Sequence, residues 1–385
     1  MKKHLLATTA AITMVGGAAS AQDWNVGVGG FFNGFIAYSD VSNAPAGSDW
    51  DGVSNYNNAE IIFAPSVTLD NGMTFGANVQ LEAFNSSGSQ IDESYMYIES
   101  DTMGKVVIGA ENSAGYAAHQ WLPGAVLPIY SPSVSAFVPV TTAFRDAFAS
   151  GATEVAGNND VNRISYFTPS FNGLTIGVSY AAGDSSNSGA QNGANLNRNA
   201  AGQLSDIFDI GVTYKQSFGT TDIALGARWG TGNREARDAE AAALAAIVDG
   251  ELVAASAAVD AVEAGDPTTW GVSGSISTAG FTFGATYAEN DADNATNVGN
   301  TSGWGVGMSY DVAGPWTIGA QAYFGERELG ANDLEYNAYT VSASRNMGPG
   351  VSWGLYAAVA ENDDNDATTS ELKGTVIGTS VSLSF

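Results

Sequence analysis

The sequence predicts an all-β protein: a sixteen-stranded antiparallel β-barrel that spans a membrane. Three observations support this. Apolar and polar residues alternate along most of the chain, short turns alternate with long polar loops, and aromatic residues lie near the ends of the alternating runs. Period-two alternation places successive side chains on opposite faces of a strand. An even number of strands, with short turns on one rim and long loops on the other, is typical of outer-membrane barrels.

The predicted strands are the runs in which large apolar residues alternate with small polar ones. In the stretch "MTFGANVQLEAF", for example, Met73, Phe75 and Val79 alternate with Thr74 and Asn78. The sixteen runs span residues 24–39, 55–69, 73–84, 91–100, 105–110, 161–169, 174–182, 205–216, 221–230, 268–277, 281–289, 302–312, 316–325, 335–345, 351–360 and 372–385. Because hydrocarbon cannot hydrogen-bond to the backbone, such a sheet spans a membrane only if it closes on itself.

Seven connections between these runs are short and carry the Gly, Asn, Asp or Pro residues that hairpin turns require. They fall at residues 70–72, 101–104, 169–173, 217–220, 278–280, 313–315 and 346–350. Longer polar segments such as "ENDADNATNVGNTS" lie between them. We therefore expect tight turns on one rim of the barrel and extended loops on the other.

The last strand ends in the sequence "GTSVSLSF". Its alternation predicts that Val381, Leu383 and Phe385 face lipid while the intervening serines face the lumen. In a closed barrel this strand is expected to pair with the first one.

A secreted β-sandwich is the competing interpretation, because its strands also alternate. A sandwich buries its apolar face and rarely needs aromatic residues at both ends of its strands. Here such residues recur near the predicted strand ends, as interfacial girdles require. They are Trp24, Tyr38, Tyr180, Trp229, Tyr287, Trp316 and Phe324. The barrel is the favoured prediction.

The N-terminus has the pattern of a signal peptide. A short basic segment precedes an apolar run at residues 5–15 and an A-x-A cleavage motif at residues 19–21. The apolar run is too short for a membrane-spanning helix. We therefore expect residues 1–21 to be a cleaved signal peptide and residues 22–385 to form a single barrel domain.

Composition excludes several function classes. Loss of Lys2 and Lys3 with the signal peptide leaves 11 of the 13 basic residues against 40 acidic ones, a formal charge of −29. A chain this acidic does not bind nucleic acid phosphates. It has no cysteine and only two histidines, His4 and His119, and the first lies in the predicted signal peptide. No histidine-based triad or multi-histidine metal site can form, and we expect no enzymatic activity and no cofactor.

Together, the exported N-terminus, the sixteen runs, "NRISYFTPSFNGLTIGVSY" at Asn162–Tyr180 and the terminal "SVSLSF" resemble the Gram-negative general porins, especially the alphaproteobacterial type. The resemblance covers nearly all of residues 22–385. It implies a homotrimer in the outer membrane, in contact with its lipid and lipopolysaccharide. It also implies passive diffusion of small hydrophilic solutes and recognition of Phe385 as an assembly signal by the barrel-assembly machinery.

The segment at residues 111–160 follows the fifth predicted strand and is longer than loops in compact domains usually are. Its stretch "HQWLPGAVLPIYSPSVSAFVPVTTAFRDAF" is apolar and aromatic, so it must be buried against something. The porin resemblance implies that this third loop folds inward and narrows the channel. An external loop at a subunit contact is the alternative.

The resemblance further suggests that opposed charges set ion selectivity at such a constriction. Strand parity places four basic side chains on the inner wall: Lys105, Arg163, Lys215 and Arg228. The loop contributes Glu111, Asp146, Glu154, Asp160 and Arg145. Locally these two signs nearly balance, so the net acidic charge acts mostly at the mouth, where it predicts a mild preference for cations.

The main functional alternative is a substrate-specific outer-membrane channel for a sugar or another small solute. Such a channel needs aromatic residues along the lumen. Inward parity gives only Phe31, Phe167 and Tyr323.

Two further features remain open. Carboxylates are grouped in two predicted loops, at Asp291, Asp293, Asp363, Asp364 and Asp366. They suit hard cations such as Ca²⁺ or Mg²⁺. Alternatively, they are solvated and bind no ion. The alanine-rich insertion at residues 231–267 has apolar residues at helical spacing, which favours either a short helical hairpin at the mouth or a flexible external loop.

Overall fold

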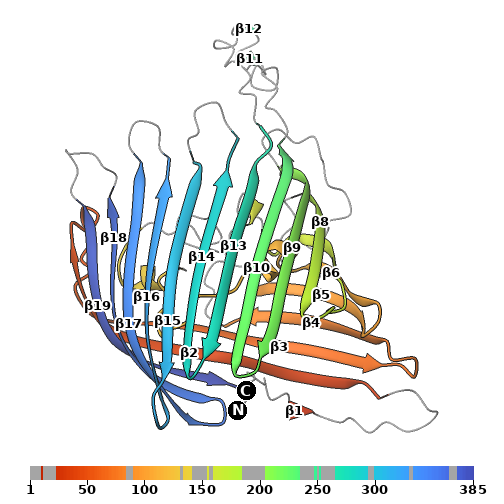
Figure 1. Cartoon of the computed structure of the whole chain (residues 1–385). Helices are drawn as coiled ribbons and strands as arrows, with labels where there is room; N and C mark the ends of the chain where they lie inside the picture. The colour runs from red at the N-terminus through yellow and green to blue at the C-terminus, as the bar shows by residue number, and fades with distance from the viewer. Residues whose placement is uncertain are drawn as a thin grey trace.

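The computed structural model describes residues 10–11, 23–83, 90–130, 133–140, 154–155, 159–183, 204–234, 247–248, 251–252, 265–293, 299–328, 333–363 and 371–385. Sixteen antiparallel strands close into one barrel (Figure 1). Each strand pairs with its neighbours in chain order, and the last pairs with the first. The predicted sixteen-stranded barrel is therefore confirmed.

The strands agree with the predicted runs to within a few residues at each end. They are β2 (Asn25–Ser42), β3 (Gly52–Thr68), β4 (Thr74–Glu82), β5 (Ile91–Ser100), β6 (Gly104–Ala110), β7 (Asn162–Phe167), β8 (Leu174–Gly183), β9 (Leu204–Phe218), β10 (Thr221–Arg234), β13 (Thr268–Thr278), β14 (Phe281–Asp291), β15 (Thr301–Asp311), β16 (Trp316–Arg327), β17 (Leu334–Gly348), β18 (Val351–Asp363) and β19 (Leu372–Ser384).

The outer face of the barrel is apolar. On β17, Tyr339 and Val341 are exposed, whereas the intervening Thr340 is 3% exposed. On β19, Val381 and Leu383 are likewise exposed, whereas Ser380 is buried. The alternation therefore gives the barrel an apolar outer face and a polar inner face, as a barrel in lipid requires.

Aromatic pairs lie near both rims of this outer face. Near the long-loop rim, the rings of Trp304 and Phe324 stack at 4.4 Å between centroids. Near the short-turn rim, Phe281 stacks on Tyr310 at 4.2 Å. Such paired rings at two levels are typical of the interfacial girdles of membrane barrels.

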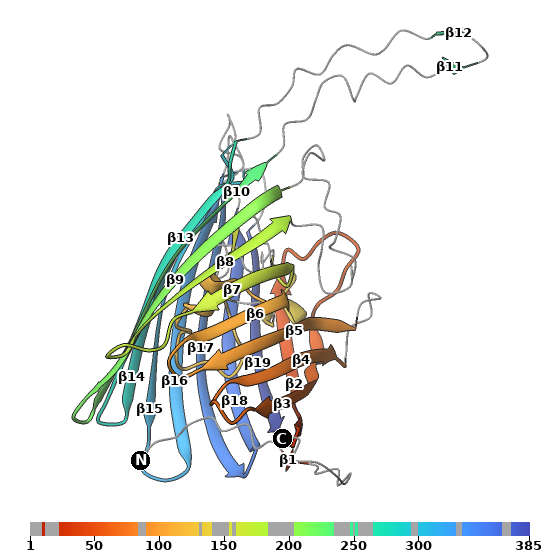
Figure 2. The same cartoon turned by 90° about the vertical axis from the view of Figure 1, so that its right-hand side faces the viewer.

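The barrel wall is uneven in height. Strands β4 to β7 have 9, 10, 7 and 6 residues, whereas the neighbouring β2 and β3 have 18 and 17. Figure 2 shows the short strands lying flatter than the steep strands that follow β8. Residues at the loop ends of β4 to β7 therefore belong to the low part of the wall.

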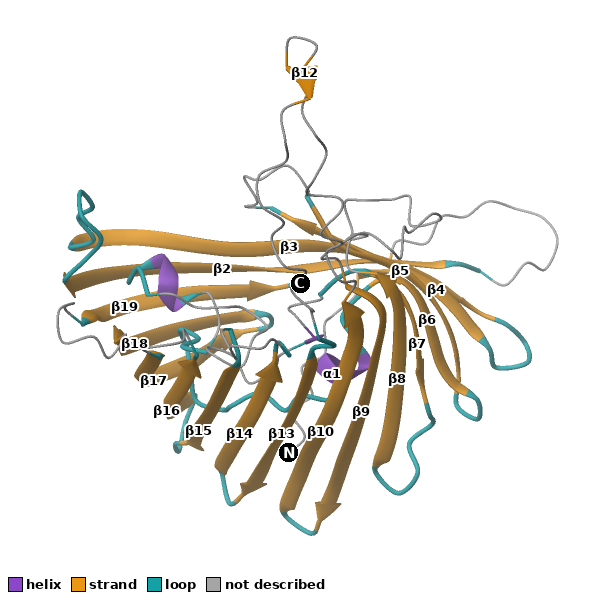
Figure 3. Ribbon diagram, turned by 90° about the horizontal axis from the view of Figure 1, so that it is seen from above, coloured by secondary structure: helices purple, strands orange, loops and turns teal. Residues whose placement is uncertain are grey.

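A short α-helix and a short 3₁₀ helix lie inside the ring of strands. They are α1 (Ala114–Ala117) and η1 (Val134–Ala136), and Figure 3 shows both enclosed by the barrel when it is seen from above. In the described part of the chain, no helix has the length and apolar character needed to cross a membrane.

Three two-residue strands complete the described part of the structure. Strand β1 (Ala10–Ala11) pairs with β2 at Val28 and Gly27, so these two residues of the predicted signal peptide lie beside the barrel edge. The cleavage of that peptide stays a prediction. In the alanine-rich insertion, β11 (Ile247–Val248) pairs with β12 (Glu251–Leu252), so these four residues are extended rather than helical. The rest of both segments lies largely outside the described residues.

Candidate functional site

A segment between β6 and β7 runs along the inner face of the barrel. Its described residues, 113–130 and 133–140, are called the inner segment below. The Gln120 amide donates to Ser273 Oγ at 2.8 Å, and Gln321 Nε2 donates to the Leu122 carbonyl at 2.8 Å. Ser342 Oγ donates to the Gly124 carbonyl at 2.6 Å. These three side chains come from β13, β16 and β17.

The three wall side chains that hold the inner segment point into the barrel, because their strand neighbours point outward. Val272 beside Ser273 is 48% exposed, and Val341 beside Ser342 is 60% exposed. Contact between the segment and the wall is therefore made on the side that does not face lipid.

The local sequence explains the path of the inner segment. Ser113 caps α1, since its Oγ accepts from the Tyr116 amide at 3.0 Å. Prolines such as Pro123 then keep the following chain extended, because proline fixes φ and cannot donate a hydrogen bond. An extended backbone has unpaired polar groups, and the side chains of the barrel wall supply their partners.

Glycines on the wall allow the inner segment to approach closely. A Cβ built on Gly226 would collide with the Ala118 carbonyl oxygen, and one built on Gly319 would collide with the backbone of Gly124. The other wall glycines at which a Cβ would press on this segment are Gly177, Gly211, Gly284, Gly305, Gly307, Gly354 and Gly374. The inner segment therefore lies against a row of wall glycines that extends from β8 to β19. This row is called the glycine track below.

Apolar packing fixes the second half of the inner segment. Val134, Phe137 and Val138 are at most 1% exposed and belong to one cluster with Tyr336 and Val376 on the wall. The Tyr336 hydroxyl also donates to the Ile129 carbonyl. Burial of several large side chains at about 1.5–3 kcal/mol each holds this half of the segment firmly in place.

Charged groups are buried where α1 meets the wall. Arg163 Nη1 lies 3.7 Å from Asp209 Oδ2, with side-chain exposures of 0% and 4%. The charges of Asp209 and Glu154 also act on Arg228, which is 7% exposed. Glu154 Oε1 in turn accepts from the Ser113 amide at 2.8 Å. The four charges thus form one buried network that joins β7, β9 and β10 to the segment.

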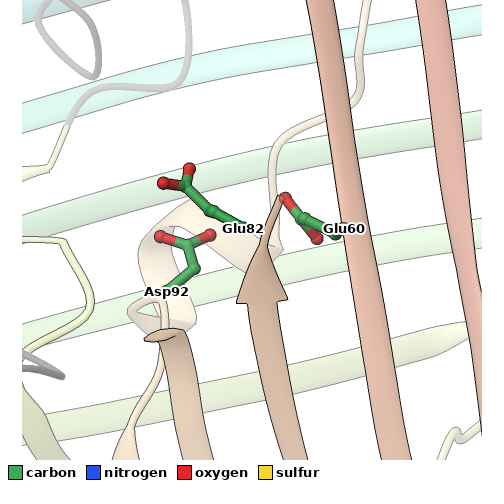
Figure 4. Close-up of side chains that lie close together, drawn as sticks. All are labelled: Glu60, Glu82 and Asp92. Atoms are coloured by element: carbon green, nitrogen blue, oxygen red, sulfur yellow. The ribbon is translucent and has the colours of Figure 1, made fainter. Parts of the chain in front are cut away.

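A second group of carboxylates lies on the low part of the wall. Glu60 on β3, Glu82 on β4 and Asp92 on β5 come within 4.8 Å of one another and are half-buried (Figure 4). Glu93 is close by and interacts electrostatically with Asp160. These residues are called the acidic cluster; with Glu111 it comprises Glu60, Glu82, Asp92, Glu93, Glu111 and Asp160.

A β-bulge explains why two consecutive residues join the acidic cluster. Val79 pairs with Ser94 but Leu81 pairs with Ile91, so two residues of β5 stand opposite Gln80 alone. The extra residue of a bulge lets two neighbours share a face that strict alternation would divide. Asp92 and Glu93 therefore both reach the acidic cluster, and Gln80 donates to Glu93.

Glu111 follows the last residue of β6 and titrates differently from an exposed glutamate. Burial raises the pKa of Glu111, and hydrogen bonds from Glu93 and Asn112 only partly oppose this effect. Glu111 therefore takes up a proton at a higher pH than an ordinary glutamate does.

If the acidic cluster attracts cations, we expect its effect to fade as the pH is lowered, beginning above the ordinary titration range of glutamate. In a Glu111→Gln variant the decline should begin at lower pH, because one carboxyl group with a raised pKa is removed. Reversal potentials across a KCl gradient at stepped pH values measure both profiles. Superimposable profiles for the two proteins would contradict the role of Glu111.

The predicted charged residues are thus divided between different surroundings. Arg163, Arg228 and Glu154 lie in the buried network, and Glu111 and Asp160 lie in the acidic cluster. Lys105 is half-buried, and its Nζ lies 4.7 Å from the centre of the Tyr97 ring. Lys215 is exposed near the short-turn rim. Arg145 and Asp146 lie outside the described residues.

The acidic cluster was not fully found from the sequence. Glu60, Glu82 and Asp92 lie on strands whose pairing brings them together, and Glu60 is the register partner of Glu82. A prediction of the β3–β4 register would have found this pair. The third carboxylate depends on the bulge, which alternation alone does not reveal.

The loop aspartates that were considered as cation ligands do not gather in the described part of the chain. Asp291 Oδ1 accepts from the Asp293 amide at 2.8 Å, which is a local turn contact. Within the described residues, Glu60, Glu82 and Asp92 form the group whose geometry could hold a metal ion. Asp364 and Asp366 lie outside those residues. Cation binding at the loop aspartates stays a prediction.

Phe385 completes the closure of the barrel. Its backbone exchanges two hydrogen bonds with Gly30, at 3.0 and 3.1 Å. Its side chain is 53% exposed on the outer face, beyond Leu383. This position agrees with the predicted parity of the last strand.

Comparison with solved structures shows the same fold. An anion-selective porin from Comamonas acidovorans has a TM-score of 0.61 and 16% identity, with 94% of this chain and all of that one covered. OmpT of Vibrio cholerae has a TM-score of 0.59 and 12% identity, over 94% and 98% of the two chains. A mutant of the Rh. blastica porin has a TM-score of 0.53 and 16% identity, over 94% and 100%.

Comparison of the sequence with family models identifies a family, which these distant structural similarities alone do not. No curated protein gives a significant match to the chain. The family model described as Gram-negative porin matches residues 7–367. With a match of this length and a closed sixteen-stranded barrel, the chain belongs to the Gram-negative porin family.

Proposed function

We propose that this protein is a water-filled channel through which ions and small hydrophilic solutes diffuse passively, with a mild preference for cations. Membership of the porin family supports an outer-membrane channel. The observation that carries the cation preference is the acidic cluster, whose half-buried carboxylates stand on the low wall while Arg163 and Arg228 are buried. Accessible charge of one sign concentrates the opposite ions in a confined lumen.

The inner segment supplies the proposed constriction. A sixteen-stranded barrel leaves an aqueous channel, and a packed segment along its inner face reduces that space. The hydrogen bonds from Ser273, Gln321 and Ser342 support a fixed rather than a mobile constriction.

Removal of charge tests the cation preference. We expect the triple variant Glu60→Gln, Glu82→Gln, Asp92→Asn to bring the reversal potential across a KCl gradient close to zero. In the parent protein the preference should weaken as ionic strength rises, since salt screens accessible charges. Clear chloride preference of the parent protein at low salt would refute the proposal.

A matched control removes three carboxylates from the loop ends: Asp291→Asn, Asp293→Asn, Asp363→Asn. The total charge change is the same, but the acidic cluster is intact. This control should keep most of the selectivity of the parent protein. An equal loss in both triple variants would assign the preference to overall charge instead of the cluster.

A substrate-specific channel is the second candidate. One observation favours it: the Tyr130 ring of the inner segment packs beside Tyr323, which faces inward. Planar-bilayer currents with sugars of graded size separate the two functions. Ohmic steps without saturation favour passive diffusion, and saturable block by one sugar favours the specific channel.

The proposed assembly is a homotrimer in contact with outer-membrane lipid and lipopolysaccharide. The structurally similar OmpT of Vibrio cholerae has a trimer form, which supports this state. Phe385, exposed at the end of the last strand, is the proposed signal for the barrel-assembly machinery. Gel migration of the native protein before and after heating measures the oligomeric state.

A further inference from the structure

The indole ring of Trp121 is exposed although its neighbours in the chain are buried. Trp121 is 43% exposed, whereas Gln120 and Leu122 are 9% and 5% exposed. The backbone N–H of Gln120 donates to Ser273 Oγ on the wall, and a Cβ on Gly305 would press on the Leu122 side chain. The chain on both sides of Trp121 thus lies against the wall, and the exposed Trp121 ring extends away from it, toward the lumen.

Other aromatic rings hold Trp121 in one orientation. Its ring stacks on Tyr130 with centroids 5.6 Å apart and an interplanar angle of 27°. Tyr116 and His119 meet it edge-on at 5.8 and 4.8 Å. Tyr130 is 6% exposed and lies against Tyr323 of β16 at 6.1 Å. Three rings therefore hold the indole in place, and 43% of the residue stays accessible to solutes.

The electrostatic surroundings of this ring favour cations. Burial and the charge of Arg228 both lower the pKa of His119, so the imidazole beside Trp121 is neutral and does not repel a positive solute. Arg228 itself is buried and compensated by Glu154 and Asp209. The accessible carboxylates Glu60, Glu82 and Asp92 attract cations into the same barrel.

We propose that the exposed indole of Trp121 is a contact site for organic cations, of the quaternary ammonium class, that enter the channel. The face of an indole ring is the most favourable aromatic surface for a cation, and weakly hydrated ammonium groups use it readily. Potassium keeps its hydration shell and gains little there. This inference rests on the proposed channel function and adds a solute class to it.

Choline is a suitable probe for the site. Potassium currents through the parent protein in planar bilayers should fall in a saturable manner as choline is added. In a Trp121→Leu variant we expect the apparent affinity for choline to fall by about tenfold, the range of a partly desolvated cation–π contact. A Trp121→Phe variant should be intermediate, because a phenyl ring attracts cations less strongly than an indole ring.

Two controls separate this contact from other effects. Trp304→Leu changes a tryptophan that is 47% exposed on the outer face of β15 and should leave the choline effect unchanged. The uncharged choline isostere 3,3-dimethyl-1-butanol should not reduce the current. Equal block by this alcohol, with equal sensitivity to Trp121, would overturn the cation preference of the site.

The outcomes also distinguish this inference from the proposed function. If the parent protein conducts potassium but choline has no saturable effect, or if Trp121→Leu and Trp121→Phe both keep the full affinity, the contact site is refuted and the channel stands. If the parent protein carries no ion current, the channel itself is refuted. Heat-dependent gel migration of each variant verifies that the barrel has formed.

Discussion

A Gly319→Val variant should conduct about twofold more current per channel than the parent protein, because a sixteen-stranded barrel without a packed inner segment leaves a wider aqueous lumen. Gly319 lies on the inner face of β16, directly against Gly124 of the inner segment. Any Cβ at this position collides with the backbone of Gly124, and backbone cannot rotate away as a flexible side chain can. The inner segment must then move off the wall.

Displacement of the segment at Gly319 also removes specific bonds. The Gly124 carbonyl accepts from Ser342 Oγ, and the preceding carbonyls of Leu122 and Pro123 accept from Gln321. Loss of each such bond costs about 1 kcal/mol. These contacts cannot form while the chain is held away from β16, so the change should spread along the glycine track.

Ala320→Val is the matched control for Gly319→Val. Ala320 is the next residue on the same strand and points to the outer face, so the larger side chain meets lipid. Single-channel recordings of both variants measure the difference. Unchanged conductance of Gly319→Val, with normal barrel formation, would show that the segment does not limit the current.

Removal of the Asp209 carboxylate should lower the free energy of unfolding by about 3–5 kcal/mol, because a buried partner charge is left uncompensated. Arg163 lies 3.7 Å from Asp209, and its side chain is fully buried. Arg228 is acted on by the same carboxylate. An Asp209→Ala variant therefore leaves an excess of positive charge in the network that joins the wall to α1.

Urea unfolding of the detergent-solubilised barrel, followed by tryptophan fluorescence, measures this loss. Glu361→Ala serves as the control, because Glu361 lies 2.7 Å from Lys373 and the side chains of the two residues are 15% and 51% exposed, against 4% and 0% for Asp209 and Arg163. A solvent-exposed pair contributes about 1 kcal/mol or less. Equal destabilisation by the two changes would show that the buried network contributes no more to the free energy of unfolding than the pair of Glu361 and Lys373 does.

The barrel strands were predictable because lipid outside and water inside impose alternation on every one of them. Strand β5 was predicted at residues 91–100 and lies at Ile91–Ser100. Strand β2 continues beyond the predicted run to Ser42, where polar residues still pair with β19. Above the apolar band, backbone pairing continues without an apolar pattern, so the sequence does not mark where the strand ends.

The site was less predictable than the strands, because it depends on contacts between distant parts of the chain. Parity assigns Arg163 and Arg228 to the inner face, but it does not reveal that both side chains are buried there. The inner segment can approach this part of the wall because positions such as Gly226 have no side chain. In the sequence, Gly226 is not distinguished from other small residues. The bulge that turns Asp92 inward is equally invisible to strict alternation.

Pairing between β2 and β19 has a consequence for biogenesis. Asn43 near the end of β2 bonds to Glu371 just before β19, across 328 residues of chain. Until β19 arrives, β2 has one open edge, and hydrocarbon cannot satisfy its amides and carbonyls. Unassisted strand-by-strand transfer of this protein into a bilayer would therefore leave unpaired backbone groups in hydrocarbon at every intermediate length. The barrel must therefore close, or its open edges must be covered by another protein, before its strands meet hydrocarbon.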